Sequence, residues 1–158
     1  GDNNVAGLIT NTANYGATTE PFLKLTEANR KTKWIDWNKY VDEQTFGLAF
    51  VKEAISAGLP ADSALLIDTS RNGWGGSDRP TKATAGDTDE AVDASRIDRR
   101  IHLGNWCNQK GAGIGERPKA APSSGVDAFV WIKPPGESDG SATEKANGKG
   151  TDAMCDPE

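Results

Sequence analysis

The sequence has little of the residue types that form metal centres, membrane spans and nucleic-acid surfaces. Its 158 residues include one histidine and two cysteines, and no apolar run approaches the roughly 18 residues of a transmembrane helix. Acidic residues outnumber basic ones by 23 to 18, which gives a formal net charge of −5. Nucleic acid and anionic membranes are therefore not expected as partners, and a neutral or cationic ligand fits better.

Hydrophobic residues are also scarce, at 35% of the chain, whereas 18 glycines and 8 prolines are present. Much of the chain is therefore expected to be loop. The length suffices for one domain with a sizeable core, since domains cluster near about 100 to 150 residues. The first residues lack the charged-then-apolar layout of a signal peptide.

The two cysteines, Cys107 and Cys155, and the single His102 do not fit the spacing of a four-ligand zinc site. We expect no metal and no cofactor. Two alternatives remain for the cysteines, namely a disulfide or two free thiols. A disulfide closing a loop of about 48 residues would contribute about 4 kcal/mol in the chain-entropy treatment and would indicate an oxidising compartment.

Short apolar runs predict buried strands at residues 5–10, 64–67 and 126–132. Between the first two, apolar residues near helical spacing predict a helix over 42–57, which Gly58 would end. Nearly all-apolar strands separated by a helix are typical of a parallel α/β sheet. A second, short helix could form within 89–103, where only two isoleucines support it, and the Gly- and Ser-rich residues 140–153 are expected to be surface loop.

A polar loop follows each predicted strand, at residues 11–16, 68–76 and 133–140. Ligand sites in parallel α/β folds lie at the carboxyl ends of the strands, so these three loops are expected to meet at one site.

The third loop carries Glu137 and Asp139 beside Lys133. Paired carboxylates next to a cation suit acid/base catalysis, because the cation decides which carboxylate stays ionised. The alternative is a solvated acidic turn. In the second loop, Arg71 follows Asp68 closely, either as a salt bridge at a strand end or as a cation that keeps a carboxylate ionised.

Five tryptophans are many for a chain of this length. Trp131 lies within a predicted strand and is expected in the core. Trp74 and Trp106 lie in predicted loops, where an exposed ring indicates recognition, and a flat ring among Asn, Asp and Arg suits a sugar. Alternatively, these rings plug the end of a barrel.

The sequence supports neither a serine hydrolase nor an enzyme with a phosphate-binding loop. No Gly-x-Ser-x-Gly motif is present, and His102 has no candidate triad partners nearby. The glycine run at 111–115 does not follow a predicted strand and lacks the lysine of a phosphate-binding loop, so it is expected to form a tight loop.

The loops resemble glycoside hydrolase family 6, the cellulases that cut β-1,4-glucan with inversion. Four ordered strings carry the resemblance, namely Thr10–Tyr15 (TNTANY), Ile67–Gly73 (IDTSRNG), Trp106–Asn108 (WCN) with Gly113–Pro118 (GIGERP), and Val130–Gly140 (VWIKPPGESDG). The resemblance implies a loop-rich α/β fold, the carboxyl-side part of a distorted seven-stranded (β/α) barrel, with residues 1–158 a partial catalytic domain. It also implies a Cys107–Cys155 disulfide and a secreted, extracellular enzyme.

The same resemblance assigns roles to individual residues. Asn14 resembles the asparagine that hydrogen-bonds a glucosyl unit, and Trp106 the tryptophan that stacks on one. Lys133 and Glu137 resemble ligands of the sugar hydroxyls. Cellulose and cello-oligosaccharides are thus the expected partners.

For catalysis, Asp139 resembles the carboxylate often proposed as the general base, which Arg71 and Lys133 would keep ionised. The 31 residues between Trp74 and Trp106 resemble the long loop of bacterial cellobiohydrolases, which implies an exo-acting enzyme that releases cellobiose from non-reducing ends. An endo-acting enzyme of the family is the alternative.

The chain departs from the family in length. A complete catalytic domain needs roughly twice as many residues, and the aspartate that serves as general acid has no match here, although inversion needs both an acid and a base. Activity would then require the missing amino-side segment as a partner. The alternative is a non-catalytic glucan-binding fragment.

Overall fold

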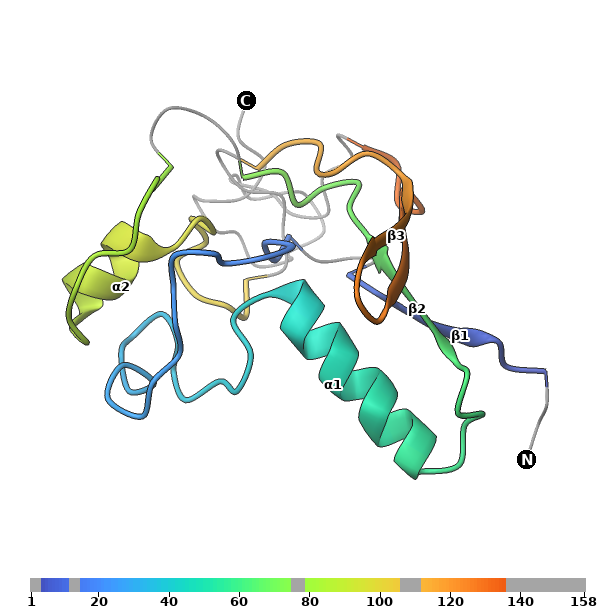
Figure 1. Ribbon diagram of the computed structural model, residues 1–158. Coiled ribbons are helices and arrows are strands. Elements are labelled where there is room, and N and C mark those ends of the chain that lie inside the picture. The colour runs from blue at the N-terminus through green and yellow to red at the C-terminus, as the bar shows by residue number, and fades with distance from the viewer. Residues whose placement is uncertain (1–3, 12–14, 75–78, 106–111, 136–158) are drawn as a thin grey trace, which may run out of the picture.

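The computed structural model describes residues 4–11, 15–74, 79–105 and 112–135 (Figure 1). Within them the chain forms four strands and two helices, in the order β1 (Gly7–Thr10), α1 (Glu43–Ser56), β2 (Ala64–Asp68), α2 (Asp89–Ser95), β3 (Lys119–Ser123) and β4 (Val126–Val130). Figure 1 shows α1 running alongside β1 and β2, with α2 on the other side of the molecule.

The four strands form one mixed sheet in the order β1-β2-β4-β3. The predicted parallel pairing is confirmed for the three predicted strands: Leu8 lies opposite Leu65 between β1 and β2, and Ile67 lies opposite Phe129 between β2 and β4. β3 runs antiparallel to β4. The sequence analysis missed β3, because its residues KAAPS combine a proline with little apolar character.

The helix predicted at 42–57 is confirmed as α1, and local signals explain both of its ends. The Asp42 carboxylate accepts a hydrogen bond from the Thr45 backbone N–H at 2.8 Å, which caps the first turn. Beyond the last turn Gly58 takes φ +116°, a conformation that favours glycine.

α1 packs against β2 and β1. A Cβ on Gly47 would lie 3.1 Å from Leu65, so glycine at this position lets the helix approach the sheet closely. Leu48 and Val51 cover a buried cluster on the sheet formed by Leu65, Ile67, Val126 and Phe129.

The long segment between β1 and α1 has a core of its own, although the sequence offered no strand or helix pattern there. Its buried apolar side chains meet α2 in one cluster, made of Leu23, Trp34, Ile35, Val41 and Val92. A smaller cluster of Tyr15, Ala17 and Trp74 lies next to the end of β2.

One fold prediction needs correction. β4 ends at Val130, so Trp131 follows the strand, is 39% exposed and is not a core residue. A short helix within 89–103 is confirmed as α2, which ends at Ser95 because the chain turns extended at Arg96 (φ −79°, ψ 139°). The described residues form an open four-stranded sheet, and the seven-stranded barrel stays a prediction.

Candidate active site at the carboxyl ends of the parallel strands

The loops that follow β1, β2 and β4 meet at one edge of the sheet, as predicted. The Asn11 side-chain amide donates to the Asp68 carbonyl oxygen at 2.9 Å, which joins the first loop to the second. The Thr69 backbone N–H donates to the Val130 carbonyl oxygen at 2.9 Å, which joins the second loop to the end of β4. The structure therefore brings the starts of the three candidate ligand loops together.

Asp68, the last residue of β2, links the second and third loops through its side chain. One carboxylate oxygen accepts the Ser70 N–H at 3.0 Å and the other accepts the Lys133 N–H at 2.9 Å, while the side chain is almost fully buried. Asp68 thus fixes the backbone at Lys133, one of the two predicted site residues that the structure describes. Its carboxylate has a structural role in the site, because each of its two oxygens accepts a hydrogen bond from a backbone N–H group.

Arg71 is the other predicted site residue that the structure describes. It is 4% exposed, and its Nη1 donates to the Tyr15 hydroxyl oxygen at 2.9 Å. Its guanidinium carbon lies 4.5 Å from the centre of the Tyr15 ring, within the range of a cation–π contact. A fixed cation is therefore buried where the strand ends meet.

The prediction that Trp74 presents an exposed ring for recognition is wrong. Trp74 is 5% exposed, and its Nε1 donates to the Tyr15 carbonyl oxygen at 2.6 Å. The side chain packs with Tyr15 and Ala17, so Trp74 is a packing residue, as the alternative expected, while the barrel end that it would plug stays a prediction.

A cavity of about 820 Å³ lies beside these residues. Its walls come from Ile97 and from three segments, residues 17–19, 72–74 and 114–119. Gly73 and Gly113 pair through two backbone hydrogen bonds of 3.0 and 2.8 Å. A Cβ on Gly73 would overlap the Ile114 carbonyl oxygen, so the wall requires glycine. The predicted tight loop at 111–115 lies partly outside the described residues, and its described part forms this bridge between Gly113 and Gly73.

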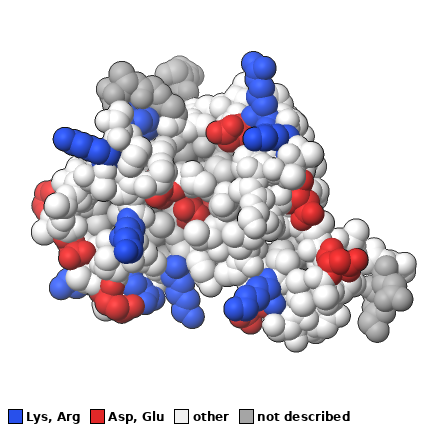
Figure 2. Space-filling view, viewed as in Figure 1, with Lys and Arg blue, Asp and Glu red and all other residues white. Residues whose placement is uncertain are grey.

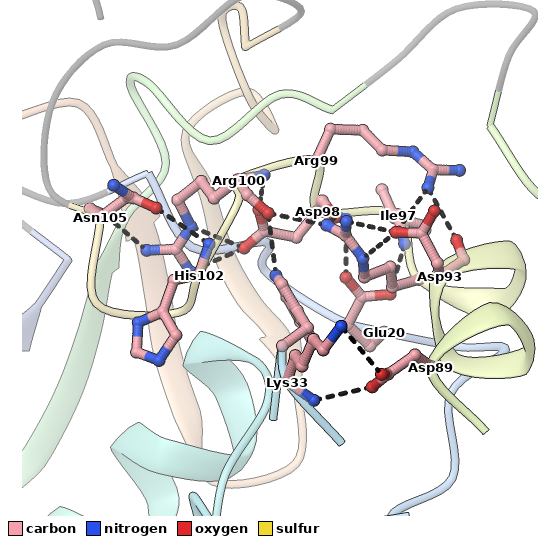
Figure 3. Close-up of polar contacts among 12 residues, drawn as sticks. Glu20, Lys33, Asp89, Asp93, Ile97, Asp98, Arg99, Arg100, His102 and Asn105 are labelled. Carbon is pink, nitrogen blue, oxygen red and sulfur yellow. Dashed lines mark hydrogen bonds and ion pairs between the residues drawn. The ribbon is translucent and has the colours of Figure 1, made fainter. Parts of the chain in front are cut away.

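A second polar cluster supports the segment that leads to Trp106 (Figure 3). The Glu20 carboxylate accepts the backbone N–H groups of Ile97 and Asp98 at 2.6 and 2.7 Å. The Asp98 carboxylate pairs with Arg100 at 2.6 Å, and Nη1 of Arg100 donates to the carbonyl oxygens of Leu103 and Asn105 at 3.0 Å each. The backbone is thereby tied down as far as the residue before Trp106.

Two buried glutamates near this cluster have perturbed pKa values. Burial raises the pKa of Glu20 from 4.5 to about 7, against the opposing effect of the two backbone N–H donors. Burial likewise raises the pKa of Glu43 to about 7, against the attraction of Arg100. Both carboxyl groups thus titrate near neutral pH.

Several predicted site residues lie outside the described residues: Asn14, Trp106, Glu137, Asp139 and the two cysteines, Cys107 and Cys155. Sequence reasoning missed two residues that shape the site. Tyr15 could have been singled out because it ends the TNTANY string, whereas nothing in the sequence marks Glu20, whose partners lie 77 and 78 positions away.

On the face shown in Figure 2, basic and acidic side chains are interspersed, with no extended area of one sign. Within residues 4–11, 15–74, 79–105 and 112–135, no group of three or more His, Cys, Asp or Glu side chains could hold a metal ion. Neither helix in that part of the chain has the length and apolar character to cross a membrane.

Comparisons with known proteins give a consistent result over the whole chain. Residues 1–158 match the family model described as "Glycosyl hydrolases family 6". Exoglucanase A of Cellulomonas fimi is 48% identical over 97% of this chain, and probable 1,4-beta-D-glucan cellobiohydrolase C of Aspergillus fumigatus is 36% identical over 96%. The solved catalytic domain of Cellulomonas fimi Cel6B matches 96% of this chain with a TM-score of 0.81 and 47% identity.

The chain spans only part of each of these proteins. It covers 19% of the Cellulomonas exoglucanase, 26% of the Aspergillus protein and 37% of the solved catalytic domain.

Proposed function

The chain belongs to the family 6 glycosyl hydrolases, and we propose that it is the carboxyl-side part of a catalytic domain that hydrolyses β-1,4-glucosidic bonds in cellulose. The observation that carries the proposal is the meeting of three family-like loops at the carboxyl ends of the parallel strands. There Arg71 is buried as a fixed cation, and Asp68 ties down the backbone at Lys133.

Asp139 is the proposed general base. It lies six residues after Lys133, in the loop whose start Asp68 holds against the end of β2. A buried guanidinium near a carboxylate favours the ionised form, which a base needs in order to take a proton from water. Arg71 is therefore proposed to keep Asp139 ionised, together with Lys133.

For the substrate, Asn14, Glu137 and Lys133 are proposed to bind glucosyl hydroxyls, and Trp106 to stack on a sugar ring. Asn14 directly precedes Tyr15, which contacts Arg71, and Trp106 directly follows Asn105, whose carbonyl oxygen accepts from Arg100. The structure thus fixes the residue that follows Asn14 and the residue that precedes Trp106. Cellulose and cello-oligosaccharides are the proposed ligands.

The reaction is proposed to invert the anomeric carbon, with the general acid supplied from the part of the catalytic domain that this chain does not span. Inverting glycosidases place the two carboxyl groups about 6.5 to 9.5 Å apart, so that a water molecule fits between base and sugar. The mode of action is proposed to be exo, with release of cellobiose, in keeping with the 31 residues between Trp74 and Trp106 and with the names of the two relatives.

Exposed apolar groups support the view that this chain packs against a further segment. Ile9 on β1 is 44% exposed, and on α1 the stacked rings of Phe46 and Phe50 are 42% and 44% exposed. The remainder of the proposed seven-stranded barrel would bury these side chains and would pair the edge of β1 that no described strand covers. The enzyme is also proposed to be secreted, with Cys107 and Cys155 joined in a disulfide.

The proposal is tested by measuring mass and activity on one sample. Intact-mass spectrometry looks for a longer chain or a second polypeptide, and sugar analysis follows cellobiose release from swollen cellulose. The proposal expects a species heavier than 16.7 kDa together with cellobiose as the main product. Random-length oligosaccharides with a rapid loss of viscosity would instead indicate an endo-acting enzyme.

A non-catalytic glucan-binding role is the second candidate, because no residue of this chain matches the family's general acid. A sample of 16.7 kDa that binds cello-oligosaccharides and releases no sugar would favour it.

A further inference from the structure

We propose that Tyr15 is a positioning residue that sets the orientation of the Arg71 guanidinium, and that Trp74 fixes Tyr15 in turn. The inference rests on the proposed function, in which Arg71 keeps the base ionised. It adds two residues to the site that neither the sequence motifs nor the comparisons assign.

Tyr15 restrains Arg71 in two ways at once. The centre of the Tyr15 ring lies 4.5 Å from the guanidinium carbon, so the ring opposes movement of the planar group toward it. The hydroxyl oxygen accepts from Nη1 at 2.9 Å, which opposes rotation of the group within its plane. An arginine side chain has several rotatable bonds, so a single contact would leave much more freedom than this pair of contacts.

Trp74, which follows Arg71 in the loop after β2, restrains Tyr15 in the loop after β1. Its Nε1 donates to the Tyr15 carbonyl oxygen at 2.6 Å, and the two side chains are 5% and 1% exposed. The segment after Tyr15 is also anchored, because the Glu43 N–H at the start of α1 donates to the Ala17 carbonyl oxygen at 3.0 Å. The Tyr15 ring therefore sits on fixed backbone.

Orientation matters for a guanidinium because its hydrogen bonds are directional. An arginine guanidinium keeps its charge throughout the working range of enzymes, so its influence on a nearby carboxylate varies with distance and angle rather than with protonation. A guanidinium that is free to turn would hold the base ionised less strongly, and the base would accept a proton at a higher pH.

The experiment compares Tyr15→Phe with Tyr40→Phe in the complete hydrolase that carries this chain. Tyr40 is the chain's other tyrosine, is 39% exposed and contacts Phe46, which makes its variant a matched control. For Tyr15→Phe we expect kcat to fall about tenfold, KM to stay within about twofold, and the acid limb of the kcat–pH profile to move up by about one pH unit. Tyr40→Phe should change none of these quantities.

An Arg71→Lys variant separates this inference from the function on which it rests. If Arg71→Lys shifts the acid limb and Tyr15→Phe does not, Tyr15 is not a positioning residue, and the proposed function stands. If neither variant shifts it, the proposed role of Arg71 is wrong, and the inference falls with it.

A second readout needs no activity. Arginine-specific labelling with phenylglyoxal, followed by peptide mapping, reports how accessible each guanidinium is. In Tyr15→Phe the labelling rate of Arg71 should rise several-fold, while that of Arg96, which is 8% exposed and stacks on Trp34 at 4.9 Å, should stay constant and show that the variant is folded. Equal Arg71 labelling in wild type and variant would overturn the inference.

Discussion

Replacing Glu20 by glutamine is expected to remove the contribution of this carboxyl group to the pH dependence of the unfolding free energy. Glu20 joins two segments that lie far apart in the sequence, because its carboxylate accepts the N–H groups of Ile97 and Asp98 (Figure 3). Burial raises the pKa of this carboxyl from 4.5 to about 7, so between these pH values the folded chain holds the proton more tightly than the unfolded chain does. Stability from this group is therefore fully present below pH 4.5 and is lost as the pH rises through 7.

The size of the effect follows from the shift in pKa. A shift of between two and three pH units corresponds to about 3 kcal/mol of unfolding free energy, since one unit is worth about 1.4 kcal/mol. Glutamine cannot ionise, but only its carbonyl oxygen can accept, so its NH2 group faces one of the two backbone N–H groups that the carboxylate binds and lowers stability by an amount that does not depend on pH. Between pH 5 and pH 8 the stability of Glu20→Gln relative to the wild type should therefore rise by about 2 to 3 kcal/mol.

Urea unfolding at both pH values measures this difference, with Glu53→Gln on an exposed part of α1 as the control. The comparison between variant and wild type is needed because Glu43, whose pKa burial also raises to about 7, changes both proteins alike. A constant stability difference between Glu20→Gln and wild type at pH 5 and pH 8 would refute the reasoning.

Three further predictions concern the site itself. Asp139→Asn should remove most hydrolysis, by a factor on the order of 10² or more, while oligosaccharide binding persists; near-full activity would exclude Asp139 as the base. Trp106→Ala should weaken cello-oligosaccharide binding by about 1 to 3 kcal/mol in a calorimetric titration, by analogy with other aromatic stacking, and an unchanged affinity would assign the ring to packing. Gly73→Ala should lower the unfolding free energy by about 1 to 3 kcal/mol, because the new methyl group overlaps the Ile114 carbonyl oxygen, and a neutral effect on the urea midpoint would contradict that geometry.

The sequence was a good guide to the parallel strands and to α1 because each has a strong local signal. Leu65 and Ile67 alternate into the sheet core, and Asp42 and Gly58 mark the two ends of the helix. These signals also placed the three loops at one edge of the sheet, since parallel strands bring their carboxyl ends together. The location of the candidate site could therefore be predicted before its geometry was known.

The remaining features depend on contacts between distant segments, which local patterns do not encode. Trp74 lies in a polar loop and was expected at the surface. Its ring is instead buried, and its Nε1 donates a hydrogen bond to the carbonyl oxygen of Tyr15, 59 positions away. β3 exists because it pairs with β4, not because its own residues favour a strand. Glu20 looks like an ordinary surface residue until the fold buries it against the loop that follows α2.

The most direct test of the central claim, that the loops at the strand ends carry the base side of an inverting cellulase, is to follow the first sugar released. Fresh hydrolysate of cello-oligosaccharide is monitored by proton NMR before the anomers equilibrate. The α-anomer of cellobiose should accumulate first, and Asp139→Asn should suppress its release. Initial release of the β-anomer would contradict inversion, and wild-type release by Asp139→Asn would contradict the role of Asp139 as the base.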